Sequence, residues 1–89
     1  MVVGKVTVTN PTGIHARTAT NLSSVCMNCE SRVELRIGQN IIDPKNMLGL
    51  LEKQIKCGTE LEVLCNGETE VEDLKTVVAF IESGMGELA

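Results

Sequence analysis

A histidine and an arginine, His15 and Arg17, are the residues of this sequence best suited to chemistry. They follow a Pro/Gly turn at residues 10–13 and stand where a helix is expected to begin. The start of a helix exposes backbone N–H groups and carries about half a positive charge, which disfavours a protonated imidazole. We therefore expect a neutral, nucleophilic His15, with the N–H groups of Ala16 and Arg17 and the Arg17 guanidinium as an anion cradle. This favours the handling of a phosphoryl group or another anion, although a lone histidine by itself is more often an ordinary surface or core side chain.

The elements that must position these residues can be predicted from hydrophobic spacing. Asn46 is expected to cap the second helix. Thr69 and Glu72 are expected to form a capping box at the third helix, and Gly84 to end it. Alternating segments predict strands at residues 2–9, 32–37, 41–43 and 60–65, and apolar residues three and four apart predict helices at 16–26, 47–53 and 71–81.

The fold class follows from the order of these elements, βαββαβα. Four strands that each have one polar face predict a four-stranded, mainly antiparallel sheet. Three helices on one face of that sheet would complete a two-layer α+β sandwich.

Composition limits the possible functions. The 89 residues predict a single domain, 1–89. A net charge of −4 and a single aromatic residue, Phe80, argue against nucleic acid as a partner. No apolar run approaches the roughly 20 residues of a membrane-spanning helix, and the first residues lack a signal-peptide pattern. We expect a cytoplasmic protein without membrane insertion.

The segment from Asn10 to Arg17, Asn-Pro-Thr-Gly-Ile-His-Ala-Arg, closely resembles the active-site region of the HPr family. These are the histidine-containing phosphocarriers of the bacterial sugar phosphotransferase system. The resemblance extends over the whole chain in length and in the order of elements. It implies an open-faced β-sandwich, and a phosphoryl group carried on Nδ1 of His15 with the help of Arg17.

The resemblance also implies the partners. Enzyme I, charged by phosphoenolpyruvate, would donate the phosphoryl group, and IIA domains of sugar permeases would receive it. The chain would be a monomeric relay protein and not a stand-alone enzyme, without cofactor or metal. A different class of function on the same fold remains open: a module that binds regulatory proteins, or a carrier dedicated to one pathway such as a nitrogen branch or a dihydroxyacetone kinase.

Two positions depart from the family pattern. Thr18 stands where the family usually has a proline, so a rigid first helical turn is exchanged for a hydroxyl and an extra N–H. Asn46 stands where many relatives carry a serine that a dedicated kinase phosphorylates. Because asparagine cannot take that phosphate, we predict that this chain lacks a regulatory phosphoserine.

A docking patch for the partners is implied beside His15 by the same resemblance. Large apolar residues in the short second helix are either core or an exposed contact surface, and methionine suits a surface that fits several partners. The expected patch consists of Ala16, Arg17, Thr20, Met47, Leu48 and Leu51.

The four cysteines are interpreted mainly as structural thiols. Cys26 and Cys29 have the spacing of half a zinc site or of a redox pair, but Cys57 and Cys65 do not form a second such pair. A metal or disulfide role therefore stays the lesser alternative.

Overall fold

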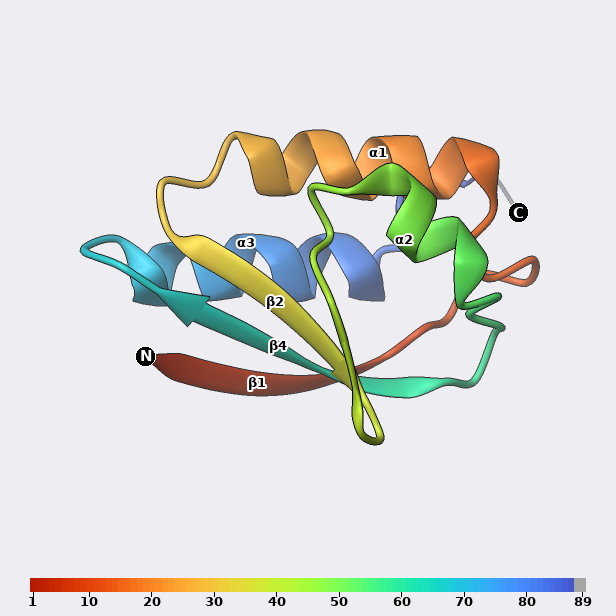
Figure 1. The fold of residues 1–89 in the computed structure, drawn as a ribbon. Helices are drawn as coiled ribbons and strands as arrows, with labels where there is room; N and C mark the ends of the chain where they lie inside the picture. Colours follow the sequence, from red (N-terminus) through yellow and green to blue (C-terminus); the bar gives the residue numbers. More distant parts are fainter. Residues whose placement is uncertain (88–89) are drawn as a thin grey trace.

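Four strands form one antiparallel sheet in the computed structural model, which describes residues 1–87 (Figure 1). The strand order across the sheet is β1-β4-β2-β3. Three helices lie on one face of this sheet, as predicted (Figure 1). The elements are β1 Val2–Thr7, α1 Ala16–Met27, β2 Arg32–Ile37, β3 Asn40–Ile42, α2 Met47–Glu52, β4 Glu60–Asn66 and α3 Glu70–Glu82. The α+β open-faced sandwich is therefore confirmed.

The two faces of the sheet differ as the alternating strand sequences predict. Leu35 and Val63 are paired in register and fully buried under the helices. On the open face, Glu62 is in register with Lys5 on one side and Arg36 on the other. Opposite charges at paired positions stabilise neighbouring strands by roughly 0.2–1 kcal/mol each. The charged pairs thus lie on the face that meets water.

The helices bury their apolar stripes against the inner face of the sheet. In α1, Ala19, Leu22 and Cys26 have no exposed surface. In α3, Val77 and Ile81 are equally buried. Burying a side chain of this size contributes about 1.5–3 kcal/mol, which compensates for the Ser and Thr residues that make α1 a weak helix by propensity.

The strand ends differ slightly from the prediction. The strand β1 ends at Thr7 instead of residue 9. The strand β3 begins at Asn40, one residue early, because Gly38 and Gln39 alone form the hairpin turn. Gly38 has a φ of 59°, which a tight two-residue turn requires.

The predicted capping box of the third helix is wrong. Thr69 is the N-cap residue, but its side chain makes no capping hydrogen bond. Its hydroxyl instead donates to Oδ2 of Asp73 at 2.7 Å, and the same oxygen accepts from the N–H of Ser31 at 3.0 Å. The Thr69 hydroxyl is therefore bonded to a carboxylate four residues along the same helix, which also accepts from distant Ser31, and Glu72 is left in solvent.

No helix within residues 1–87 combines the length and the hydrophobicity that crossing a membrane would require. Three segments meet at one end of the sandwich: the loop between β1 and α1, the start of α2, and the chain after α3 (Figure 1). The candidate residues His15, Thr20 and Met47 lie at this end.

Candidate functional site at the start of helix α1

A tight turn after β1 delivers His15 to the start of α1. The N–H of Gly13 donates to the carbonyl of Asn10 at 3.1 Å, and the N–H of Ile14 donates to the carbonyl of Ile55 at 2.8 Å. Gly13 has a φ of 66°, and a Cβ there would lie 2.3 Å from the Ile55 oxygen. Only glycine fits this turn. The sequence Asn-Pro-Thr-Gly therefore sets the position of the histidine that follows.

His15 is the N-cap residue of α1 and has extended backbone angles. Its Nδ1 accepts a hydrogen bond from the N–H of Arg17 at 3.4 Å. Its Nε2 lies 2.9 Å from Oε2 of Glu87. The imidazole is about 41% exposed, so a protein partner can reach it. Nδ1 thus faces the free N–H groups of the helix start, where an anion would be stabilised.

Glu87 is a member of the site that the sequence did not reveal. Besides His15, it contacts the hydroxyl of Thr12 in a short hydrogen bond, the N–H of Thr12 at 3.3 Å and Nδ2 of Asn10 at 3.4 Å. The hydrogen bond from Thr12, followed by that from His15, lowers the pKa of Glu87 to about 2. At neutral pH a carboxylate therefore stands against the ring.

The position of Glu87 depends on how α3 ends. Gly84, with a φ of 96°, stops the helix as predicted, and the N–H of Met85 donates back to the carbonyl of Phe80 at 3.1 Å. Met85 is fully buried, and Nδ2 of Asn21 in α1 donates to its carbonyl at 3.0 Å. Glu87 and His15 are 72 residues apart, so no local pattern could have paired them.

Thr18 occupies the usual proline position with a buried hydroxyl. Its side chain has no exposed surface. The hydroxyl donates to the carbonyl of Gly13 at 3.0 Å and accepts from the N–H of His15 at 3.0 Å. This reciprocal cap joins the turn to the first turn of α1. Hydrogen bonds here take the place of the fixed φ that proline would supply.

Arg17 and Ala16 are exposed on the first turn of α1. Within residues 1–87, no carboxylate lies within ion-pair distance of the Arg17 guanidinium. The side chain is thus exposed two residues after His15 and is available to an incoming anion.

Two members of the expected docking patch are in contact between α1 and α2. The hydroxyl of Thr20 in α1 lies 3.1 Å from the sulfur of Met47 in α2. Met47 is 39% exposed and Leu48 is 68% exposed, whereas Leu51 is half-buried against the core. The alternative that these apolar residues belong to the core is thus wrong for Leu48 and partly right for Leu51.

Asn46 caps α2 as predicted. Its Oδ1 accepts from the N–H of Gly49 at 3.4 Å. The side chain is exposed.

The cysteines lie apart from the His15 site. Cys26, Cys29 and Cys65 are buried, and Cys57 is exposed. Burial raises the pKa of Cys26 to about 12 and that of Cys65 to about 11, and it also raises the pKa of Cys29. No group of three or more metal-ligating side chains that could hold an ion occurs within residues 1–87.

We expect Cys57 alone to react quickly with a thiol reagent in the native protein. The other three thiols are shielded and protonated, and only the thiolate reacts. Mass spectrometry after a short exposure to iodoacetamide at pH 8 should find one adduct, on Cys57. In denaturant all four should react. Rapid native labelling of Cys26 or Cys65 would contradict this reading.

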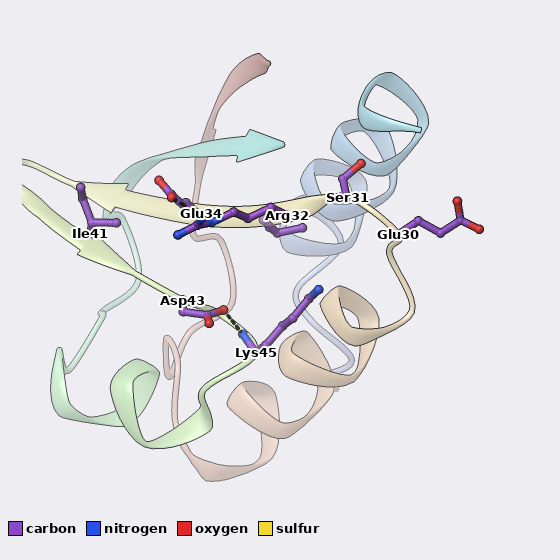
Figure 2. Close-up of a pocket in the computed structure, with 8 residues that line it drawn as sticks. Glu30, Ser31, Arg32, Glu34, Ile41, Asp43 and Lys45 are labelled. Carbon is purple, nitrogen blue, oxygen red and sulfur yellow. Dashed lines mark hydrogen bonds and ion pairs between the residues drawn. The ribbon is translucent and has the colours of Figure 1, made fainter. Parts of the chain in front are cut away.

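An open depression of about 520 Å³ lies along β2, separate from His15 (Figure 2). Arg32 and Glu34 lie beside each other on β2 as an ion pair of 3.5 Å, and on the segment before α2 Oδ1 of Asp43 accepts from the N–H of Lys45 at 3.0 Å. None of its lining residues contacts His15. It contributes nothing to the site at α1.

The chain is similar in sequence and in fold to known phosphocarrier proteins. A family model described as "PTS HPr component phosphorylation site" matches residues 2–83. The phosphocarrier protein NPr of Klebsiella oxytoca is 32% identical over 83 residues, which is 92% of each chain. A multiphosphoryl transfer protein of Xanthomonas campestris is 30% identical over 77 residues, 86% of this chain, and the match spans only 9% of that relative. A crystal structure of HPr from Thermoanaerobacter tengcongensis superimposes with a TM-score of 0.92 at 25% identity, over 100% of both chains.

Proposed function

This chain belongs to the HPr family of phosphocarriers in the phosphotransferase system, and on that premise we propose that His15 accepts a phosphoryl group from phospho-enzyme I and passes it to IIA domains of sugar permeases. The observation that carries the proposal is the placement of His15. Its Nδ1 faces the N–H of Arg17 at the start of α1, and the Arg17 side chain is exposed on the same first turn. A nucleophilic nitrogen and an anion cradle therefore share one exposed point.

The proposed step needs no metal or cofactor. The Nδ1 lone pair attacks the phosphorus of the donor's phosphohistidine, the new N–P bond forms, and the donor nitrogen leaves with the electron pair of the old one. The backbone N–H groups of Ala16 and Arg17 and the guanidinium then stabilise the bound phosphoryl oxygens. The reverse of this step on a IIA histidine passes the group on. In this proposal His15 carries the phosphoryl group covalently between two partners, and the chain is a substrate of those partners. The chain would work as a cytoplasmic monomer, in the same compartment as enzyme I charged by phosphoenolpyruvate.

The direct test is phosphoryl uptake. Purified chain is incubated with enzyme I, Mg²⁺ and phosphoenolpyruvate, and its intact mass is measured before and after acid treatment. We expect an increase of one phosphoryl group that acid removes, because N-phosphoryl bonds are acid-labile. A chain that shows no increase, or an increase that survives acid, is not the proposed carrier.

A carrier dedicated to one pathway is the second candidate, because the similar proteins include an NPr as well as an HPr. The phosphorylated chain can be offered to a panel of purified IIA domains from sugar permeases and from the nitrogen branch. Transfer to several sugar IIA domains supports the general carrier. Transfer only to the nitrogen-branch acceptor supports the dedicated one.

We propose that partners bind the docking patch of Ala16, Arg17, Thr20, Met47, Leu48 and Leu51. Leu48 is its most exposed apolar member, so its contact area is available to a partner. We expect Leu48→Asp to raise the KM for transfer from enzyme I roughly tenfold with little change in kcat. The control is Val71→Asp, an exposed apolar residue in the first turn of α3. Equal KM values for both variants would remove the patch from the proposal.

The chain is also proposed to lack the serine switch of its relatives, since Asn46 has no hydroxyl. A serine kinase acting on the family should label Asn46→Ser and leave the wild-type chain unlabelled. Phosphate on the wild-type chain would contradict this.

A further inference from the structure

We propose that Glu87 is a positioning residue for His15: its carboxylate holds the ring proton on Nε2, keeps the lone pair on Nδ1, and balances the charge of the phosphorylated ring. The placement of the ring proton and of the lone pair concerns the unphosphorylated protein. The balancing of charge on the phosphorylated ring rests on the proposed function. Glu87 belongs to no motif in the sequence, and its role follows from where the chain places it after α3.

The contacts of the imidazole distinguish its two nitrogens. Nδ1 lies 3.4 Å from the N–H of Arg17, which can only donate, so a proton on Nδ1 would clash with it. Nε2 lies 2.9 Å from Oε2 of Glu87, which as a carboxylate can only accept. Both contacts favour the same tautomer, with hydrogen on Nε2. The Arg17 contact is the longer of the two, so Glu87 makes the larger contribution.

The carboxylate is held at this point by groups other than His15. Thr12 donates to it from both its hydroxyl and its N–H, and Nδ2 of Asn10 lies 3.4 Å from Oε2. These donors keep the side chain ionised and restrict its rotation. The side chain is only 13% exposed, so water competes weakly for the His15 contact.

The backbone around Glu87 is held equally well. Its N–H donates to the carbonyl of Gly84 at 3.0 Å. Met85 has a φ of 55°, unusual for a residue other than glycine, and is kept there by complete burial and by the hydrogen bond from Asn21. The strained turn therefore aims Glu87 at the ring instead of leaving it in solvent.

This placement matters during phosphoryl transfer. When the Nδ1 lone pair bonds to phosphorus, no proton leaves the ring, because Nε2 keeps its hydrogen. The ring then carries a positive charge beside the bound phosphoryl dianion. The Glu87 carboxylate at Nε2 compensates that charge and keeps the ring a good leaving group for the next transfer. A carboxylate has both tasks for the catalytic histidine of serine proteases.

The first experiment needs no partner. The ¹⁵N chemical shifts of His15 are measured at a pH where the ring is neutral, in the wild type and in Glu87→Ala. We expect the wild type to be almost entirely the Nε2–H tautomer and Glu87→Ala to be a mixture. An unchanged tautomer ratio in Glu87→Ala would overturn the positioning role. Because this measurement uses unphosphorylated protein, its result stands whether or not the proposed function holds.

The second experiment separates charge from hydrogen bonding. Glu87→Gln keeps an oxygen that accepts from Nε2 but has no charge. We expect it to retain the Nε2–H tautomer and to slow transfer from phospho-enzyme I by roughly 10-fold to 100-fold in kcat/KM. Wild-type rates in Glu87→Gln would overturn the charge-balancing role. The matched control is Glu82→Gln, an exposed carboxyl on the last turn of α3, which should transfer at the wild-type rate.

Discussion

The variant His15→Asn is expected to fold like the wild type and to take up no phosphoryl group from phospho-enzyme I. An amide nitrogen has no free lone pair for attack on phosphorus, so we expect uptake to fall by at least about 10³-fold. Asparagine is nevertheless among the best N-cap residues, and its Oδ1 can accept from the first turn of α1 as Nδ1 of His15 now does. The variant thus removes the nucleophile and keeps the helix cap.

His15→Ala is the companion variant that separates chemistry from stability. Alanine lacks both the nucleophile and the cap, so it should be equally inactive and less stable than His15→Asn by about 1 kcal/mol. The measurements are intact mass after incubation with enzyme I and phosphoenolpyruvate, and urea unfolding followed by circular dichroism. An acid-labile phosphoryl group on His15→Asn would place the acceptor on another residue and remove His15 from its proposed role.

The residues that local sequence could predict are those whose role is local. A helix cap acts on N–H groups two or three residues away, so Asn46 was identifiable from its neighbours. Likewise β2 was predicted at its observed bounds, Arg32–Ile37, because each side chain alternates between core and water. The turn around Gly13 and the helix start after it are local in the same sense.

The parts that could not be predicted all depend on a contact between distant segments. Thr69 had the spacing of a capping box, yet its hydroxyl turned to Asp73, which also accepts from Ser31 across the fold. Glu87 reaches His15 only because α3 runs back along α1 and ends in a turn anchored by Met85. Asp73 lies in the same helix as Thr69, but the contact of its carboxylate with Ser31 is set by packing between distant segments, which no short window of sequence contains.

Thr18→Val is expected to be the most damaging conservative change near the site. Valine fills the same space without a hydroxyl, so the N–H of His15 loses its partner and the carbonyl of Gly13 keeps only the hydrogen bond from Asn10. Leaving a buried polar group unpaired costs about 1–3 kcal/mol. We expect the free energy of unfolding to fall by roughly 2 kcal/mol, measured by urea denaturation with an unchanged m-value.

Thr18→Ser tests the same argument from the other side. Serine keeps the hydroxyl and loses one buried methyl group, so its cost should be only about 0.8 kcal/mol. Thr18→Pro restores the residue usual in the family and presets φ, but it also lacks the hydroxyl, so we expect its stability to lie between those of the Val and Ser variants. Equal stability of Thr18→Val and the wild type would contradict the role given to the hydroxyl.

The same three variants connect this cap to phosphoryl transfer. The hydroxyl of Thr18 holds the backbone N–H of His15, and Nδ1 must stay aligned with the N–H groups of the first turn to bind a phosphoryl group. If the backbone of His15 is held less firmly, Nδ1 is less well aligned with these N–H groups. Small displacements of a reacting atom slow group transfer steeply. We therefore expect kcat/KM with phospho-enzyme I to rank wild type, Ser, Pro and Val in descending order, in parallel with stability. A Thr18→Pro variant that is less stable than wild type but transfers faster would show that rigidity at this position matters more than the hydrogen bonds that replace it.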